Sequence, residues 1–552
     1  MPHQKPSCGT LTESLAALAL SAFDAKAYFP PTGQVIAMGQ LNEAADRVAS
    51  AALAAGVIPG ELVGVLAGAT PYFLTTIFGL WRAGAAVTVL PVPEGLENSA
   101  GAASRAAAIV KEAGLRYVVA DQDNWTGAER LANLIPGLAL LSAGHLATAG
   151  ILRANLPDPD PGRLAVVQFT SGSTSKPKGV MLTHRTVLAG LEAIAISARF
   201  SPDDVLMQWV PLFHDMGLMG MLSVLLTGGQ VHVFSPLFFL RRTAALMEYF
   251  SRHRGTILTG PNFSYDYMFD MVPPERLAAL DLSSWRLAFN GAEPVAAATA
   301  ERFSSILAPS GVSPTVMYPV YGMAEATLAI SFPRPGTEAR TVSVDKNALV
   351  PGGMVVPVPD GSADAKRVVS VGYPVHGLSA RIAEGDEQGR FGEIQIRGDA
   401  ITSGYHRNPA AARELFADGW FRTGDLGFFL AGELFVVGRR KEMIIVHGQN
   451  FFPEDVEAIA REIPGVFRKR CIVVPLVDGD TEQMGVIAES RASGAESAVL
   501  GKEIAARLAA VLNLNQVKVH VVEPHWLTRT TSGKWQRTLS AKRMTQPEEA
   551  YR

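Results

Sequence analysis

The stretch from Phe169 to His184 (FTSGSTSKPKGVMLTH) concentrates hydroxyl side chains, glycines and lysines between an apolar run and a helix-like continuation. Glycine, serine and threonine allow tight bends that direct several N–H and O–H donors to one place, and lysine adds positive charge. This composition suits a polyphosphate, although a solvated surface turn is the simpler alternative. It is not a Walker phosphate loop, because Pro177 stands where the second glycine belongs and Lys178 is not followed by serine or threonine. A P-loop NTPase is therefore disfavoured.

Three carboxylates lie next to apolar segments. Glu325, in YGMAEATL, could hold Mg²⁺ beside phosphates. Asp425, between glycines and aromatic residues in WFRTGDLGFF, could accept both hydroxyls of a ribose. The turn FNGAEPV around Glu293 offers backbone groups to a purine. Each of them, taken alone, could equally be a turn that carries a solvated charge.

Segments typical of helices and strands alternate from residue 41 onward and must position these turns. Near-continuous Val/Ile/Leu strands with intervening helices predict a largely parallel, buried sheet. After about Ala339 the chain becomes rich in Val, Gly and Pro, which indicates short strands and turns. The last 110 or so residues follow a βαββαβ-like pattern of small-domain size. We predict a large domain over 1–437, a hinge at 438–441 and a small domain over 442–552.

The whole-chain composition excludes several classes. The 552 residues are expected to form two or three domains, and a net charge of −3 gives no sign of nucleic-acid binding. Cys8 and Cys471 cannot form a disulfide framework or a cysteine zinc site, so a reducing, cytoplasmic setting is expected. The apolar run Met216–Gly229 is too short to span a membrane. Thr10 with Glu13 predicts a capping box that opens an amphipathic helix rather than a signal peptide.

Taken in order, these stretches resemble the motifs of the adenylate-forming superfamily, which includes acyl-CoA ligases, peptide-synthetase adenylation domains and luciferases. The match runs from about Leu41 to Arg537. The wording of WVPLFHDMGLMG, GPNFSYDYMFDMV and GQNFFPEDVE is similar to the fatty acyl-AMP ligases, which pass an acyl group to an acyl carrier protein. The departures are Gln449, where an arginine is usual, and SPLFFLRRTA, which lacks an expected Gln-Arg-Pro.

The resemblance implies an α/β fold with two doubly wound α/β subdomains, a small β-barrel-like subdomain and a small mobile α+β C-terminal domain. Residues 331–371 look like the extra segment that, in fatty acyl-AMP ligases, hampers the rearrangement needed for coenzyme A. An acyl-CoA ligase is the alternative. Deleting the segment should raise CoA thioester formation only in the first case.

The resemblance also implies ATP and Mg²⁺ as cofactors and a role for each motif. Lys534 would bridge the substrate carboxylate and the α-phosphate, Thr174 would lie near the transfer, and Glu325 would hold Mg²⁺. Lys441 would be the hinge residue. The other implied nucleotide-binding residues are Thr170, Ser171, Gly172, Ser173, Lys178, Gly291, Ala292, Glu293, Tyr321, Gly322, Met323, Asp425 and Arg439.

The acyl pocket is expected within parts of Trp209–Leu226 and Asn262–Met268, although plain core packing explains the same residues. The implied acyl-contacting residues are His214, Met216, Met219, Phe263 and Tyr267. Asp215 leaves open an enzyme that activates amino acids by pairing with a substrate amine. A catalytically silent nucleotide-binding protein is the rival from another class. The expected partners are a fatty acid and a phosphopantetheine-bearing acyl carrier protein, with no nucleic acid and no stable membrane insertion.

Overall fold

The computed structural model describes residues 9–21, 25–92, 99–150, 156–170, 177–446, 449–478, 481–512, 517–528 and 535–545. The chain divides into two compact units. The first contains 1–340, 369–380 and 395–422, and the second contains 341–368, 381–394 and 423–552. The division predicted at 437–441 stays a prediction.

The first unit includes two large, mostly parallel sheets, and the N-terminal one has six strands in the order β6-β5-β3-β4-β7-β8. Its strands run parallel except β8, which pairs antiparallel with β7. The strands are β3 (Leu62–Leu66), β4 (Ala86–Val89), β5 (Tyr117–Ala120), β6 (Ala139–Ser142), β7 (Leu164–Thr170) and β8 (Lys178–Thr183). The helices of this part are α1 (Leu11–Leu20), α2 (Met38–Ala54), α3 (Pro71–Arg82), α4 (Ser99–Ala113), α5 (Trp125–Leu134), α6 (Ala143–Thr148) and α7 (His184–Ser197).

The second sheet of this unit has seven strands in the order β13-β12-β11-β9-β10-β1-β2, parallel except for β2. Its strands are β1 (Lys26–Phe29), β2 (Gln34–Ala37), β9 (Val205–Gln208), β10 (Gln230–Val233), β11 (Ile257–Gly260), β12 (Leu287–Asn290) and β13 (Met317–Pro319). Its helices are α8 (Asp215–Thr227), α9 (Pro236–Arg252), α10 (Asn262–Met271), α11 (Pro274–Ala278) and α12 (Ala297–Leu307).

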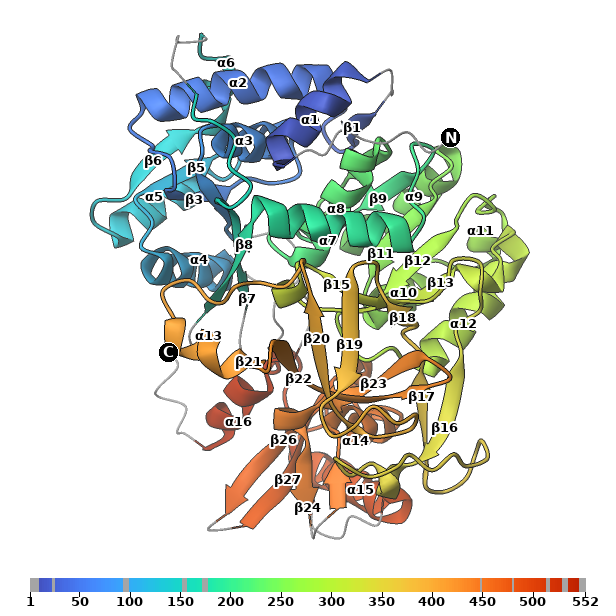
Figure 1. Cartoon of the computed structure of the whole chain (residues 1–552). Coiled ribbons are helices and arrows are strands. Elements are labelled where there is room, and N and C mark those ends of the chain that lie inside the picture. The colour runs from blue at the N-terminus through green and yellow to red at the C-terminus, as the bar shows by residue number, and fades with distance from the viewer. Residues whose placement is uncertain are drawn as a thin grey trace. The chain divides into compact units, whose positions relative to one another are not determined.

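These strands are apolar because helices cover the sheets. In Figure 1, α2 and α3 lie above β3 and β5, and α4 lies below them. Every residue of β4, β11 and β12 is buried. Strands buried on both faces read as continuous apolar runs. The parallel, buried sheet predicted from the sequence is therefore confirmed.

The N-terminal helix begins as the capping box predicts. The Thr10 hydroxyl accepts a hydrogen bond from the backbone N–H of Glu13 (3.3 Å) and donates to the Glu13 carboxylate (2.9 Å). The helix is held by His184, the first residue of α7, whose Nδ1 accepts from the Leu11 N–H at 3.4 Å. Among the described residues, no helix is both long and apolar enough to cross a membrane.

Short strands follow the second parallel sheet. A three-stranded sheet is formed by β14 (Tyr321–Gly322), β15 (Ala329–Phe332) and β18 (Tyr373–Pro374). A further sheet has the order β19-β20-β22-β21, with β23 paired to β22. Its strands are β19 (Leu378–Ile382), β20 (Gly392–Gly398), β21 (Phe416–Ala417), β22 (Trp420–Leu430) and β23 (Glu433–Arg439), and α13 (Pro409–Leu415) precedes β21.

The C-terminal part of the second unit is a small α+β layer, as the sequence pattern predicted. The sheet β26-β27-β28 is covered by α14 and α15 around buried residues such as Val456, Ile504 and Val486. Its elements are β24 (Ile444–Val446), β25 (Gln449–Phe451), α14 (Pro453–Ala460), β26 (Cys471–Asp478), β27 (Thr481–Glu489), α15 (Ala495–Leu512), β28 (Val517–Val522) and α16 (Arg537–Thr545).

The segment after the YGMAE motif also belongs largely to the second unit. Two strands, β16 (Thr341–Asp345) and β17 (Ala365–Val369), pair with each other. Val344 and Val368 lie in one core cluster with Phe428 and Phe435 of the β22–β23 hairpin and with Phe452. Apolar burial therefore ties this segment to both the hairpin and the start of α14.

Candidate active site

Two of the predicted purine-binding segments lie at one edge of the seven-stranded sheet. Residues 291–293 follow β12 and residues 321–323 begin just after β13, the neighbouring parallel strand. The Val320 N–H donates to the Asn290 carbonyl at 2.8 Å. Ala292 has φ +69°, a left-handed conformation that costs a non-glycine residue energy and recurs at ligand sites. A Cβ on Gly322 would come within 1.8 Å of the Leu328 carbonyl oxygen, so this turn requires glycine.

Glu325 lies in a tight turn whose geometry is fixed from elsewhere in the fold. Thr327, two residues after Glu325, has φ +63° and is fully buried. Its hydroxyl donates to the Ala400 carbonyl at 2.9 Å. The Glu325 carbonyl accepts from the Thr402 N–H at 2.8 Å. The half-buried carboxylate accepts a hydrogen bond of 2.6 Å from the Tyr405 hydroxyl. The turn therefore points one carboxylate oxygen at a neutral donor.

Tyr405 connects Glu325 to the strand that follows the hydroxyl-rich loop. Its backbone bridges to Val180 of β8. The Nζ of Lys178, the first residue of β8, lies 5.3 Å from the centre of the Tyr405 ring. Lys178, Tyr405 and Glu325 thus form one cluster in the first unit. Sequence reasoning selected the lysine and the glutamate but missed Tyr405, whose only local signal is an aromatic residue after a glycine in SGYHRN.

The hydroxyl-rich loop itself is described only at its ends. Thr170 ends β7 and pairs directly with Lys178 at the start of β8. The predicted residues Ser171, Gly172, Ser173 and Thr174, and also Lys534, lie outside the described residues. The two ends of the loop therefore stand side by side at one end of the sheet.

In the second unit, the structure brings together the residues predicted to bind the ribose. Asp425 and Arg439 face each other directly on the antiparallel strands β22 and β23. The Asp425 Oδ1 lies 3.0 Å from Nε of Arg439, and Asp425 is only 4% exposed. Its backbone N–H donates to the Thr423 hydroxyl at 3.0 Å. Lys441, the predicted hinge residue, is exposed and follows β23 in a single helical turn.

The loop between β9 and α8 is rigidly held, which matters because the sequence predicts the acyl pocket there. The Gln168 side chain donates to the Phe213 carbonyl and the Gln208 side chain to the Val210 carbonyl, both at 2.7 Å. A Cβ on Gly217 would lie 2.1 Å from the Pro211 carbonyl oxygen, so the first turn of α8 packs directly on this loop.

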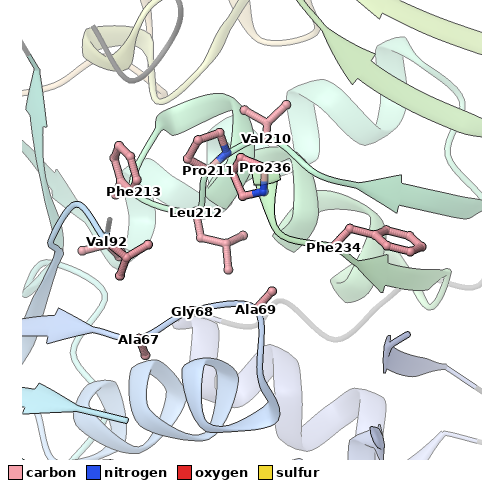
Figure 2. Close-up of a pocket in the computed structure, with 11 residues that line it drawn as sticks. Ala67, Gly68, Ala69, Val92, Val210, Pro211, Leu212, Phe213, Phe234 and Pro236 are labelled. Carbon is pink, nitrogen blue, oxygen red and sulfur yellow. The ribbon is translucent and has the colours of Figure 1, made fainter. Parts of the chain in front are cut away.

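A small apolar pocket lies against the same loop (Figure 2). It is bordered by the segments that follow four strand ends, two from each parallel sheet. Ligand sites in parallel α/β sheets lie outside the carboxyl ends of strands. Its lining residues are Ala67, Gly68, Ala69, Val89, Val92, Val210, Pro211, Leu212, Phe213, Phe234 and Pro236.

Three of the five predicted acyl-contacting residues lie together. Met216 belongs to a core cluster against which Phe263 and Tyr267 pack, and the Tyr267 hydroxyl donates to the Leu240 carbonyl at 2.6 Å. His214 is half-buried at the start of α8, with its ring 4.6 Å from that of Phe213, and Met219 is fully buried on the same helix.

Helix α10 is anchored to the sheet beneath it by Tyr265. Its hydroxyl donates to the Phe289 carbonyl at 2.7 Å, and burial raises the pKa of this hydroxyl well above its usual value. The anchor holds the helix that carries Phe263 and Tyr267 at a fixed distance from β12.

The site chemistry fits a magnesium nucleotide rather than a metal held by protein alone. Among the described residues, no group of three or more His, Cys, Asp or Glu side chains could hold a metal ion. Mg²⁺ keeps several waters and is usually bound by one or two carboxylates together with substrate phosphates. Glu325 is a carboxylate of that kind, and its hydrogen-bond donor Tyr405 is uncharged.

The fold and these motifs place the protein in a known class. A model of the AMP-binding enzyme family matches residues 19–406, and a model of the AMP-binding enzyme C-terminal domain matches residues 448–542. The chain therefore belongs to the AMP-binding enzyme family, which is the adenylate-forming family that the sequence resembles. Enzymes of this family use ATP, and generally Mg²⁺.

Similar proteins narrow the relationship. The chain is 31% identical over 489 residues to the medium-chain-fatty-acid–[acyl-carrier-protein] ligase JamA of Moorena producens, covering 84% of this chain and 82% of that protein. It is 36% identical over 417 residues to the long-chain-fatty-acid–AMP ligase FadD26 of Mycobacterium marinum, covering 70% of each. A structure from a study of fatty acyl-adenylate ligases of E. coli and L. pneumophila matches with a TM-score of 0.89, 28% identity and 99% coverage of both chains.

Proposed function

We propose that the protein activates a fatty acid with ATP and passes the acyl group to the phosphopantetheine thiol of an acyl carrier protein. The relatives named above as fatty-acid–carrier-protein and fatty-acid–AMP ligases support this. So does the fold, which matches that of fatty acyl-adenylate ligases over nearly the whole chain.

The reaction has two steps. A carboxylate oxygen of the fatty acid attacks the α-phosphorus of ATP, the bond from that phosphorus to the bridging oxygen breaks, and pyrophosphate leaves. The carrier thiol, having lost its proton, then attacks the acyl carbon of the acyl-AMP, and AMP leaves with the bonding electrons. The first step brings two anions together, so preorganised positive charge supplies most of the rate.

The observation that carries the proposal is the cluster of Lys178, Tyr405 and Glu325 beside the hydroxyl-rich loop. Glu325 would hold Mg²⁺, which neutralises phosphate charge when bound. Lys178 and the loop would hold the β- and γ-phosphates, with Thr174 near the transfer. Lys534 would join the substrate carboxylate to the α-phosphate, and rotation about Lys441 would then admit the thiol.

In this proposal residues 341–368 bias the enzyme toward a carrier protein and against coenzyme A. Lys366 on β17 forms an ion pair with Asp455 of α14, and its Nζ lies 4.8 Å from the centre of the Phe452 ring. The Asn450 side chain donates to the Leu349 carbonyl at 3.3 Å. These contacts hold the start of the small C-terminal domain against the segment, which would resist its rotation.

The adenylation step is tested by pyrophosphate release from ATP, Mg²⁺ and a panel of fatty, aryl and amino acids. We expect release with fatty acids that depends on Lys534. A Lys534→Ala variant should lose roughly 10²–10³-fold in rate, the usual effect of removing one electrostatic stabiliser. Release with no acid in the panel, or an undiminished rate in the variant, would contradict the proposal. Pyrophosphate release with amino acids alone would favour the alternative of an amino-acid-activating enzyme, in which Asp215 pairs with the substrate amine.

The choice of acceptor is tested separately with holo-acyl carrier protein and coenzyme A. We expect the wild type to form acyl-carrier thioester in preference to acyl-CoA, and Lys366→Ala to raise the acyl-CoA fraction. Lys346→Ala is the matched control, because Lys346 lies on the same segment but pairs with Asp364 at 3.2 Å. An equal rise of the acyl-CoA fraction in both variants, or no rise in Lys366→Ala, would show that the ion pair between Lys366 and Asp455 does not influence the choice of acceptor.

A further inference from the structure

One buried hydrogen-bond donor at the predicted acyl site has no hydrogen-bond partner in the part of the chain that the structure describes. Trp81, Trp209 and Trp285 are each at most 4% exposed. The indole N–H of Trp81 donates to the Ala165 carbonyl at 2.8 Å, and that of Trp285 donates to the Leu287 carbonyl at 3.1 Å. The indole N–H of Trp209 has no hydrogen-bond partner among the described residues. Buried donors of this kind are rare and call for an explanation.

Trp209 lies in one of the segments in which the sequence predicts the acyl pocket. It follows directly after β9, at the carboxyl edge of the seven-stranded sheet. Its ring stacks on Phe239, with centroids 3.9 Å apart, and meets Phe263 edge to face at 6.3 Å. Val210 and Phe234 belong to the same core cluster as Trp209 and also line the pocket of Figure 2. The indole is therefore packed in the core cluster that supplies two of the residues lining that pocket.

The edge of the indole next to its nitrogen faces Gly260. A Cβ on Gly260 would lie 3.2 Å from Cζ2 of Trp209, the ring carbon next to the fusion carbon that bears Nε1. The neighbouring Ser264 hydroxyl donates to the Pro261 carbonyl at 2.7 Å and does not accept from the Trp209 N–H.

A buried hydrogen-bond acceptor, the side-chain oxygen of Asn290, belongs to the strand next to Gly260. Asn290 is fully buried and pairs with Gly260 across β11 and β12. Its amide orientation is fixed by Asn262, whose Oδ1 accepts from the Ala296 N–H at 3.1 Å and therefore must also accept from Nδ2 of Asn290, at 3.0 Å. This leaves Oδ1 of Asn290, which has no partner among the described residues. An unpartnered donor and an unpartnered acceptor thus belong to residues on either side of Gly260.

We propose that the acyl site selects a hydroxylated fatty acid, whose hydroxyl oxygen accepts from Nε1 of Trp209 and whose O–H donates to Oδ1 of Asn290. The inference rests on the proposed adenylation of a fatty acid by this site. An unsubstituted chain would bury both polar atoms without partners, and a site built this way discriminates strongly against the analogue that lacks the hydroxyl. A hydroxyl is the simplest group that both accepts and donates.

The first test uses the wild-type enzyme alone. Pyrophosphate release is measured for medium-chain fatty acids that carry one hydroxyl at successive carbons and for their unsubstituted parents. We expect one hydroxyl position to raise kcat/KM over the parent acid by about 10- to 100-fold, the effect of one or two buried hydrogen bonds. Parent acids that match or exceed every hydroxy acid would overturn the inference while leaving the proposed adenylation intact. No release with any acid would refute the adenylation itself.

The second test assigns the preference to Trp209. In Trp209→Phe the ratio of kcat/KM for the favoured hydroxy acid over its parent should fall about 10-fold or more, because phenylalanine keeps the ring stack but lacks the N–H. Trp285→Phe is the matched control, since it removes an N–H that is already satisfied from the same core cluster. The ratio cancels any general loss of activity. A ratio unchanged in Trp209→Phe, or lowered equally in Trp285→Phe, would contradict the inference.

Discussion

Glu325 and Asp425 are both acidic residues in short turns or hairpins, but the fold treats them differently. Glu325, in the first unit, is half-buried, and its carboxylate accepts from the neutral hydroxyl of Tyr405. Asp425, in the second unit, is almost fully buried and lies opposite the guanidinium of Arg439 on two antiparallel strands. A carboxylate paired with a neutral donor keeps its net charge for a cation, whereas one beside a guanidinium is suited to accept hydroxyls. The proposed roles of the two carboxylates, Mg²⁺ binding for Glu325 and ribose binding for Asp425, therefore follow from their surroundings rather than from their residue type.

The largest effect is expected at Glu325. Glu325→Gln keeps the shape of the side chain but removes the negative charge that would hold Mg²⁺ near the phosphates. The kcat of adenylation should fall by roughly 10²–10³-fold, and the Mg²⁺ concentration for half-maximal rate should rise. Discrimination between ATP and 2′-deoxy-ATP should not change. Mg²⁺ titrations of pyrophosphate release, run once with ATP and once with 2′-deoxy-ATP, measure the kcat, the Mg²⁺ dependence and the nucleotide discrimination. An unchanged Mg²⁺ dependence would show that Glu325 does not hold the metal.

Asp425 should give the opposite pattern. Asp425→Asn weakens acceptance of the ribose hydroxyls, so the KM for ATP should rise by about 10- to 100-fold, as expected for hydrogen bonds to a charged group. The preference of the wild type for ATP over 2′-deoxy-ATP should largely disappear, while the Mg²⁺ dependence stays the same. If the variant still discriminated between the two nucleotides, the ribose role would belong to another residue.

A smaller change at Tyr405 sharpens the comparison. Tyr405→Phe removes the 2.6 Å hydrogen bond to Glu325 and leaves the ring near Lys178. The Mg²⁺ dependence should shift in the same direction as in Glu325→Gln, with only about a 3- to 10-fold loss of kcat, the typical effect of one hydrogen bond. A loss as large as that of Glu325→Gln would mean that the hydroxyl itself takes part in the chemistry.

The smallest effect on activity is expected at His184, which follows directly after the strand that begins with Lys178. Burial lowers the pKa of His184 to about 4, so the folded state keeps the imidazole neutral while the unfolded state takes up a proton below about pH 6.5. The contribution of His184 to the free energy of unfolding should therefore fall by about 3 kcal/mol between pH 6.5 and pH 4. His184→Asn keeps an acceptor for the Leu11 N–H, and its urea midpoint should change less over this range. An identical pH profile would exclude His184 as the cause.

Those features of the fold that depend on residues close together in the sequence were predictable. Apolar strand runs gave the parallel sheets, and the spacing of Thr10 and Glu13 gave the start of α1. The resemblance implied that Asp425 and Arg439 share a binding site, and the structure pairs them on adjacent antiparallel strands.

Contacts between distant parts of the chain were not predictable. Tyr405 meets Glu325 across 80 positions because its backbone bridges to β8, and no local pattern encodes that bridge. The ion pair between Lys366 and Asp455 depends on the same kind of long-range packing. That the N–H of Trp209 has no partner among the described residues depends on how the chain folds around it, because the sequence shows only one more tryptophan after a strand.

The central claim is that a substrate carboxylate attacks the α-phosphorus of ATP at this site. It is tested most directly with a fatty acid labelled with ¹⁸O in its carboxyl group, incubated with enzyme, ATP, Mg²⁺ and holo-acyl carrier protein. The AMP released with the thioester should carry one labelled oxygen, and the pyrophosphate should carry none. Unlabelled AMP, or label in ADP or inorganic phosphate, would contradict the account.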